Sequence, residues 1–489
     1  MQKSEFHKSA ARNIRMVQDL FEGDATLKIR TLCAGENLGC TCALLFLDGL
    51  VNVTVLNDAV LQPLSKLPRV QPGHSVMEAV KNSGLFISFY NEIKTLDELK
   101  SEIMLGSTLL FVDGSDSCLA VDTKGWSARA ISEPESERVL RGPREGFVET
   151  MMVNVSMIRR RLATTDLKFE LQKLGRVTRT NLCICYIKGL VEPGILRELK
   201  RRLERVSYDS VVDSNYISEL IRDNPRSPFR TINTTERPDV VAAKLLEGRI
   251  AVIVDGSPVV LTLPCLYSEL MQSPDDYYLN YYYASFGRLM RMFSAFLCYS
   301  VPAIYLALIT FHQELIPTPL LISIAKAREG VPLPSVLEAL ILLLAFDLLR
   351  ETGVRTPASI GQALSIVGAL VLGQSAVEAR FVSAPMIIVV AISGVTSLIV
   401  PRISGALDLI KYPLLILSSL FGLYGYAAGF ITVLAMLYSM NSFGVPYMAY
   451  SSMLGVKYWQ DIYLRAPWPK IKRRPFFSRN RDRYEKEVD

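Results

Sequence analysis

The most informative feature of the chain is its uneven distribution of apolar and polar positions. Residues 1–287 mix charged and apolar positions as soluble domains do, whereas long apolar runs dominate from Phe293 onward. The runs are Phe293–Phe311, Ser335–Leu349, Ser359–Val377, Ala384–Val400 and Tyr412–Met440. Because a helix needs about 20 residues to cross the hydrocarbon core of a bilayer, the second part of the chain predicts membrane helices.

The second and fifth runs decide the number of crossings. The second is short and carries two acids, and the fifth has 29 residues, which is more than one simple span requires. Three glycines near its middle are expected to break the fifth run into two half-length helices: Gly422, Gly425 and Gly429. The five runs therefore predict either four or six crossings.

The two ends of the chain predict its orientation. The N-terminal sequence is polar and basic without an apolar core, so it does not resemble a secretory signal peptide. Residues 464–483 contain eight Lys or Arg against one acid, and such clusters remain on the cytoplasmic side of membranes. Both ends are expected in the cytoplasm, which requires an even number of crossings.

The soluble part alternates strand and helix patterns, including an expected strand at Leu85–Tyr90, and it contains a repeat. ALLFLDGLV at 43–51 corresponds to CICYIKGLV at 183–191, and LFVDGS at 110–115 corresponds to IVDGS at 253–257. The offsets are 140 and 142 residues. They predict two related α/β subdomains, with chance similarity of strand–turn fragments as the alternative.

A charged stretch at 133–165 joins the two copies. Gly142-Pro143 is a suitable helix start, because proline at the first helical position loses only an amide that would be unpaired. Glu145 and Glu149 follow, and three arginines come at the end, which is the charge order that a helix dipole favours. The stretch is either a capped connecting helix or an assembly surface. The residues expected on such a surface are Arg141, Arg144, Glu145 and Glu149.

The remaining chemistry argues against an enzyme. Two C-x-C pairs lie in apolar, strand-like runs and predict buried, reduced thiols, and only three scattered histidines occur. Common nucleotide-binding, hydrolase and zinc-protease motifs are absent from the sequence. We therefore expect no catalytic residues, no cofactor, no metal site and no nucleic-acid partner.

Four stretches resemble one protein family. They are EP…E…V.RGPREGFVE…N…IRRR within 133–161, HQELIPTPLLISIAKAREGVPLP at 312–334, GVRTPASIGQALSIVGALVLGQSAVEA at 353–379, and NSFGVPYM at 441–448. Their residues and order resemble the A subunit of the GerA-type spore germinant receptors. The resemblance covers most of the chain between about Asp113 and Met448.

The resemblance implies a multi-pass protein of the spore inner membrane. Its implied partners are a transporter-like B subunit, a lipoprotein C subunit, further copies of itself and the lipid bilayer. The implied function is a germinant-gated monovalent cation channel that triggers germination. The related sporulation stage V AF protein, which supports ion release after germination begins, is the alternative. A transporter is disfavoured, because no inverted repeat is visible among the apolar runs.

Polar residues inside the apolar runs are the candidate functional residues. Carboxylates are costly in hydrocarbon, so Glu338 and Asp347 are expected to face protein, water or the interface. Small residues recur at four-residue steps in the third run, which suits either close helix packing or a pore. The candidate pore-lining residues are Gln362, Ser365, Ile366, Ala369, Leu370 and Gly373.

The sequence thus predicts an α/β part followed by an α-helical membrane part. The expected divisions are a first cytoplasmic subdomain (1–132), the connecting helix (133–165), a second subdomain (166–287), a transmembrane domain (288–448) and a basic cytoplasmic tail (449–489).

Overall fold

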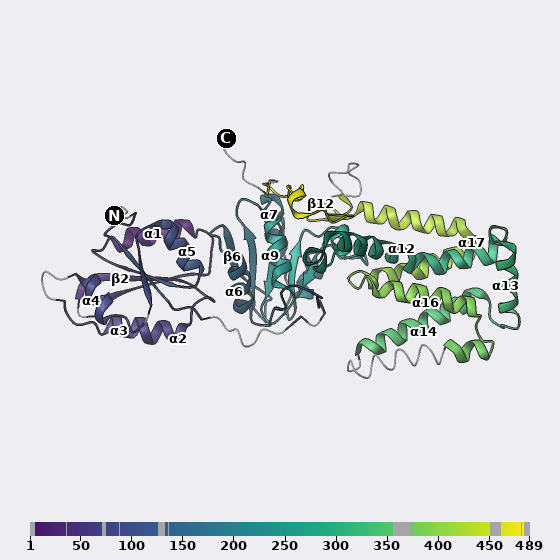
Figure 1. The fold of residues 1–489 in the computed structure, drawn as a ribbon, viewed down its shortest axis with the longest axis horizontal. Coiled ribbons are helices and arrows are strands. Elements are labelled where there is room, and N and C mark those ends of the chain that lie inside the picture. The colour runs from purple at the N-terminus through teal and green to yellow at the C-terminus, as the bar shows by residue number, and fades with distance from the viewer. Residues whose placement is uncertain are drawn as a thin grey trace. The chain divides into compact units, whose positions relative to one another are not determined.

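The computed structural model describes residues 5–35, 37–70, 75–87, 89–125, 133–134, 136–355, 373–449, 461–480 and 482–483 (Figure 1). It divides into two compact units. The sheet unit comprises Met1–Arg222, Ile232–Pro264 and Lys472–Asp489, and the helical unit comprises Asp223–Thr231 and Cys265–Ile471.

The first subdomain of the sheet unit is a five-stranded antiparallel sheet with helices on both faces (Figure 1). Its strand order is β1-β2-β4-β5-β3. The strands are β1 Leu27–Ala34, β2 Asn37–Leu47, β3 Tyr90–Ile93, β4 Thr108–Val112 and β5 Cys118–Val121. The helices are α1 Ala10–Leu20, α2 Val53–Val55, η1 Leu56–Leu61, α3 Gln62–Ser65, α4 Val76–Ser83 and α5 Leu96–Met104.

Successive side chains of the strands point to opposite faces of this sheet, and apolar side chains form a core on each face. On β2, Ala43 and Leu45 pack with α1 and α5, whereas Cys42 and Leu44 pack with η1, α3 and α4. This follows from the two-residue period of a strand. A capping box at Thr95 and Glu98 fixes the start of α5.

The second subdomain repeats the first. Its strand order, β6-β7-β9-β10-β8, is that of the first sheet shifted by five strands, so the predicted duplication is confirmed. The strands are β6 Leu167–Leu174, β7 Thr180–Ile187, β8 Asn233–Thr235, β9 Ile250–Val254 and β10 Val260–Leu263. The helices are α6 Met151–Arg161, α7 Pro193–Glu204, α8 Ser214–Ile221 and α9 Pro238–Leu246.

Three of the four thiols in the C-x-C pairs are buried as predicted, whereas Cys40 is only half-buried. Cys42, Cys183 and Cys185 are buried and free, and burial raises the pKa of the Cys42 thiol to about 12. Thiols with pKa values this high remain protonated and unreactive near neutral pH.

Two local predictions are wrong. The connecting helix α6 begins at Met151, after the N-cap Thr150, and not at Gly142-Pro143. Residues 143–148 form no regular element, because their backbone groups bond elsewhere. Phe147 N donates to Glu236 O (2.7 Å), and the guanidinium of Arg237 donates to Pro143 O (2.7 Å).

The expected strand at Leu85–Tyr90 is the second error, since β3 starts only at Tyr90. Phe86 N donates to Ala59 O (2.9 Å), which holds this segment against the neighbouring helices. The apolar run is therefore a connection and not a strand.

The described residues of the helical unit are mainly helical (Figure 1). The described helices are α10 Tyr267–Leu270, α11 Asp275–Tyr278, α12 Tyr281–Phe311, η2 Gln313–Leu315, α13 Thr318–Arg328, α14 Ser335–Arg355, α16 Ala384–Leu398 and α17 Ser404–Ser439. The strand pair β11 Asn441–Ser442 and β12 Val445–Pro446 and the short helix η3 Trp468–Lys470 follow. Within the described residues, α12 and α17 are long and apolar enough to cross a membrane.

Helix α17 is broken at Gly422, as predicted for the fifth apolar run. Gly422 has φ +62°, ψ −142°, which is not helical. A Cβ on Gly429 would lie 2.6 Å from Leu414 Cδ2, and Gly425 lies directly against the Leu417 backbone. These pairs are nearly equidistant from residue 421, so the two halves of α17 fold back on each other as a hairpin. The glycines permit this close approach.

Candidate functional site

An ion network, in which Asp408 and Lys411 are buried and Asp347 and Arg350 are partly buried, links α14 to α17 within the helical unit. Lys411 Nζ lies 3.0 Å from carboxylate oxygens of both Asp347 and Asp408. Arg350 completes the network by pairing with Asp408, and its guanidinium also donates to Ser397 Oγ on α16 (3.1 Å). With two acids and two bases, the network carries no net formal charge.

Hydrogen bonds fix the geometry of this ion network. Tyr412 donates its phenolic proton to Asp347 Oδ2 (2.5 Å). The Lys411 side chain is only 3% exposed and that of Asp408 only 11%. Charges that are this buried are costly unless every one has a partner. Removal of one partner would therefore disturb α14 and α17 together.

Glu338, the other predicted intramembrane acid, has a different environment. It is fully buried on α14. Its Oε1 accepts hydrogen bonds from Ser383 N (2.5 Å) and Ser383 Oγ (2.6 Å), whereas Oε2 has no hydrogen-bond partner among the described residues. Ser383 is the N-cap of α16, and a carboxylate is stabilised at a helix N-terminus.

The candidate pore-lining residues fall mostly outside the part of the chain that the structure describes. Gln362, Ser365, Ile366, Ala369 and Leu370 lie outside the described residues. Gly373 begins a described helical segment, 373–378, and faces Ile387 of α16. Pore lining stays a prediction.

The candidate assembly residues lie before and around the start of α6. Arg141 and Glu149 are exposed. Arg144 Nε lies 3.8 Å from Glu133 Oε1, and both side chains face solvent. Glu145 lies 2.7 Å from Arg161 in the last turn of α6. This stretch is a charged surface, and its role in assembly stays a prediction.

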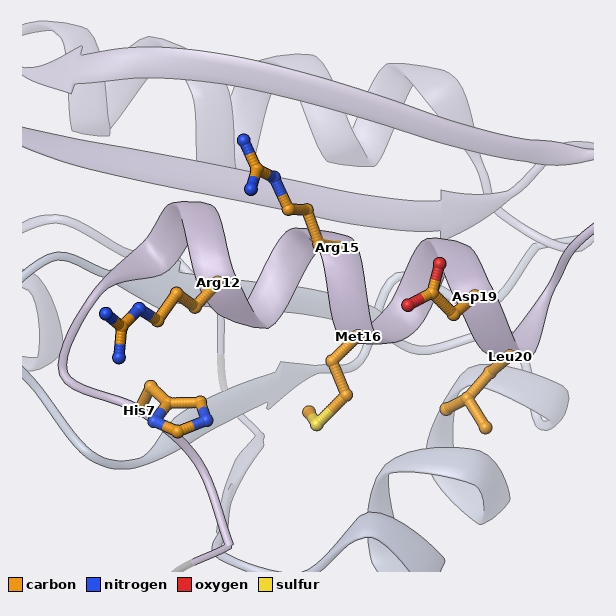
Figure 2. A pocket seen from close by; sticks show the side chains of 6 residues that line it. All are labelled: His7, Arg12, Arg15, Met16, Asp19 and Leu20. Carbon is orange, nitrogen blue, oxygen red and sulfur yellow. The ribbon is translucent and has the colours of Figure 1, made fainter.

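The sheet unit has an open surface pocket of about 540 Å³ on α1. His7, Arg12, Arg15, Met16, Asp19 and Leu20 line it (Figure 2). Figure 2 shows these side chains spread along α1 and the segment that precedes it, with Arg15 directed away from His7. In the part of the chain that the structure describes, no three His, Cys, Asp or Glu side chains are grouped to hold a metal ion.

Sequence reasoning missed half of the ion network. Asp408 and Lys411 precede the fifth apolar run as it was delimited, so their place in α17 was not considered. Their i,i+3 spacing, which puts opposite charges on one helix face, was the available signal.

The chain is similar to known proteins along most of its length. It matches the family described as Bacillus/Clostridium GerA spore germination protein over residues 15–477. Spore germination protein KA of Bacillus subtilis (strain 168) is 41% identical over 96% of this chain and 86% of that protein. The uncharacterized membrane protein YfkQ of the same organism is 40% identical over 95% of this chain and 90% of that protein.

A solved structure, the N-terminal domain of the A subunit of the Bacillus megaterium spore germinant receptor GerK3, is also similar. It is 30% identical and covers 55% of this chain and 99% of that chain, with a TM-score of 0.44. The family match extends across segments of both the sheet unit and the helical unit.

Proposed function

Because the chain belongs to the Bacillus/Clostridium GerA family of spore germination proteins, we propose that it is the A subunit of a nutrient germinant receptor. Several copies would surround an axis in the spore inner membrane and form a germinant-gated path for monovalent cations. The proposal assigns the chain no enzymatic activity.

The ion network is the observation that supports a conducting role best. A helix bundle that serves only as an anchor needs no buried charges, and each one is expensive. Here four charges tie α14 to α17. Such a network gives the bundle a defined resting arrangement that a signal can change.

The proposed topology has six crossings. Helices α12, α14 and α16 supply three, the two halves of α17 supply two, and the segment 359–377 supplies the sixth. Each half of α17 spans about 27 Å at 1.5 Å per residue, close to the thickness of the hydrocarbon core. Six crossings leave both ends in the cytoplasm, in agreement with the basic tail.

The proposed partners are a transporter-like B subunit and a lipoprotein C subunit. Membership of the spore germination family, together with the resemblance of the sequence to receptor A subunits, supports companion subunits here. In this arrangement the B subunit binds the germinant chiefly, and this chain carries the response across the membrane.

The second candidate is a stage V AF-type protein that supports ion release after germination has begun. The similarity to YfkQ, which is named only as a membrane protein, fits this candidate as well as the first. The two candidates predict different defects in the response to germinants when the gene is deleted.

Deletion of the gene therefore distinguishes the receptor subunit from the AF-type protein. Spores without it are exposed to single amino acids, sugars and nucleosides while K⁺ release is recorded. A receptor subunit predicts loss of the response to some nutrients, with normal kinetics for the others. An AF-type protein predicts slower ion release for every nutrient. Normal release with every nutrient would contradict both, and a plasmid copy of the gene is the control.

A further inference from the structure

The C-terminal strap, defined as residues 461–480 with Asp482 and Arg483, is anchored at two places. One anchor lies in the helical unit and the other in the sheet unit, because the chain passes between the units after Ile471. Each anchor consists of specific contacts within its own unit.

The first anchor joins the strap to the N-terminal part of α12. Asp461 Oδ1 accepts from Arg288 (3.0 Å), and Tyr277 donates its phenolic proton to Asp461 Oδ2 (3.2 Å). Arg288 is fully buried and also bonds Asp276 (2.9 Å). Arg288 thus joins Asp461 of the strap to Asp276 of α11 through charged hydrogen bonds inside the helical unit.

The second anchor fastens the strap to the second subdomain. Arg474 Nε donates to Leu246 O (2.9 Å) and Arg479 N donates to Leu190 O (3.0 Å). Arg483 lies 3.3 Å from Glu247. A Cβ on Gly248 would lie 2.8 Å from Ser478 Oγ, so the turn after α9 is shaped to receive the strap.

Arg249 stands at the centre of the second anchor. It is nearly fully buried, and its guanidinium lies 4.8 Å from the ring centroid of buried Phe477. The same guanidinium donates to Pro264 O, the last residue before the chain enters the helical unit. One side chain thus contacts both the strap and the departing chain.

Only residues 469–473 separate the two anchors along the chain. Trp468, which stacks on Arg465 at 4.6 Å, ends the first, and Arg474 begins the second. Pro467 and Pro469 lie in or beside the first anchor's end, and proline fixes φ near −65°. A displacement at the second anchor is therefore passed along a short, stiff segment.

We propose that the strap is a tether that transmits movement of the second subdomain to α12. Its docking surface is the turn Leu246–Arg249 together with Leu190, and its occupant is the chain's own C-terminal segment. The sheet unit is thereby coupled to a membrane helix through side chains as well as through the direct chain connections after Arg222, Thr231 and Pro264.

Hydrogen exchange on the purified full chain in detergent tests this tether. Phe477→Ala removes the buried ring, so exchange should rise about a hundredfold in the strap. It should also rise about tenfold at Tyr281–Arg291, because the tether slackens. Tyr208→Ala, which removes an exposed ring of the same subdomain, is the matched control and should change neither region.

A second variant isolates transmission through the strap. A flexible insertion of about six Gly and Ser residues between Ile471 and Lys472 leaves both anchors intact. In the chain with this insertion, Phe477→Ala should speed hydrogen exchange in the strap but not at Tyr281–Arg291. The proposal is overturned if Phe477→Ala does not change hydrogen exchange at Tyr281–Arg291 in the chain without the insertion. It is also overturned if Phe477→Ala speeds exchange there by the same factor with and without the insertion.

Discussion

At the scale of single residues, the buried charges of the helical unit matter most. The cost of charge in hydrocarbon was enough to select Glu338 and Asp347 from the sequence as residues of interest. It did not identify their partners. Lys411 and Tyr412 contact Asp347 across two helices, and such a pairing depends on packing that no local pattern records.

Lys411→Met is expected to destabilise the helical unit by about 3 kcal/mol, because Asp347 and Asp408 lose their shared cation and keep only Arg350 as a charged partner. Thermal unfolding of the purified chain in detergent measures this. Lys326→Met on α13, where the lysine is exposed, is the matched control and should change stability by no more than about 0.5 kcal/mol. Equal effects of the two substitutions would show that the network is not stabilising.

Glu247 makes the second anchor of the strap pH-sensitive. Burial alone would raise its pKa, but Lys244, Arg249 and Arg483 lower it below the ordinary 4.5. A lowered carboxyl pKa adds stability that is present above the unfolded-state value and is lost as pH falls through the folded-state value.

We therefore expect the strap to become more accessible to protease as pH falls below about 4.5. An acid-stable protease reports this from pH-dependent cleavage at the strap. Glu247→Gln cannot titrate, so its cleavage should depend less on pH over the same range. A wild-type profile identical to that of Glu247→Gln would contradict the assignment.

At the scale of elements, alternation and repeats predicted most of the sheet unit. The duplication of the sheet was visible in the sequence, because it rests on an internal match. The start of α6 was not visible. Residues 143–148 carry a good helix signal, yet Glu236 and Arg237, far along the chain, take their backbone hydrogen bonds.

The hairpin of α17 requires glycine where its two halves touch. Gly425→Leu should prevent this contact and greatly reduce the amount of folded protein, because Gly425 lies directly against the Leu417 backbone. Gly405→Leu in the same helix is the matched control, since no atom lies within 4 Å of its added Cβ. Size-exclusion profiles in detergent compare the two, and similar monodisperse yields would refute the hairpin.

At the scale of the whole molecule, the proposed six-crossing topology rests on the basic tail and on the break in α17 at Gly422. Reporter fusions after residue 280 and after residue 480 should both give cytoplasmic signals, since six crossings return the chain to its starting side. A fusion after Gly330, between α12 and α14, should give the opposite signal. An exported C-terminus would contradict the even number of crossings.

The central claim is that this chain forms a cation path, with the segment 359–377 from each copy around the axis. If Ile366 and Leu370 close the path, alanine at either position widens an apolar constriction that gates by excluding water. K⁺ release from dormant spores, recorded without germinant, tests this most directly. The account predicts leakage and premature germination for Ile366→Ala and Leu370→Ala, at wild-type levels of membrane protein. Variant spores that hold their K⁺ and respond to germinant like wild type would contradict it.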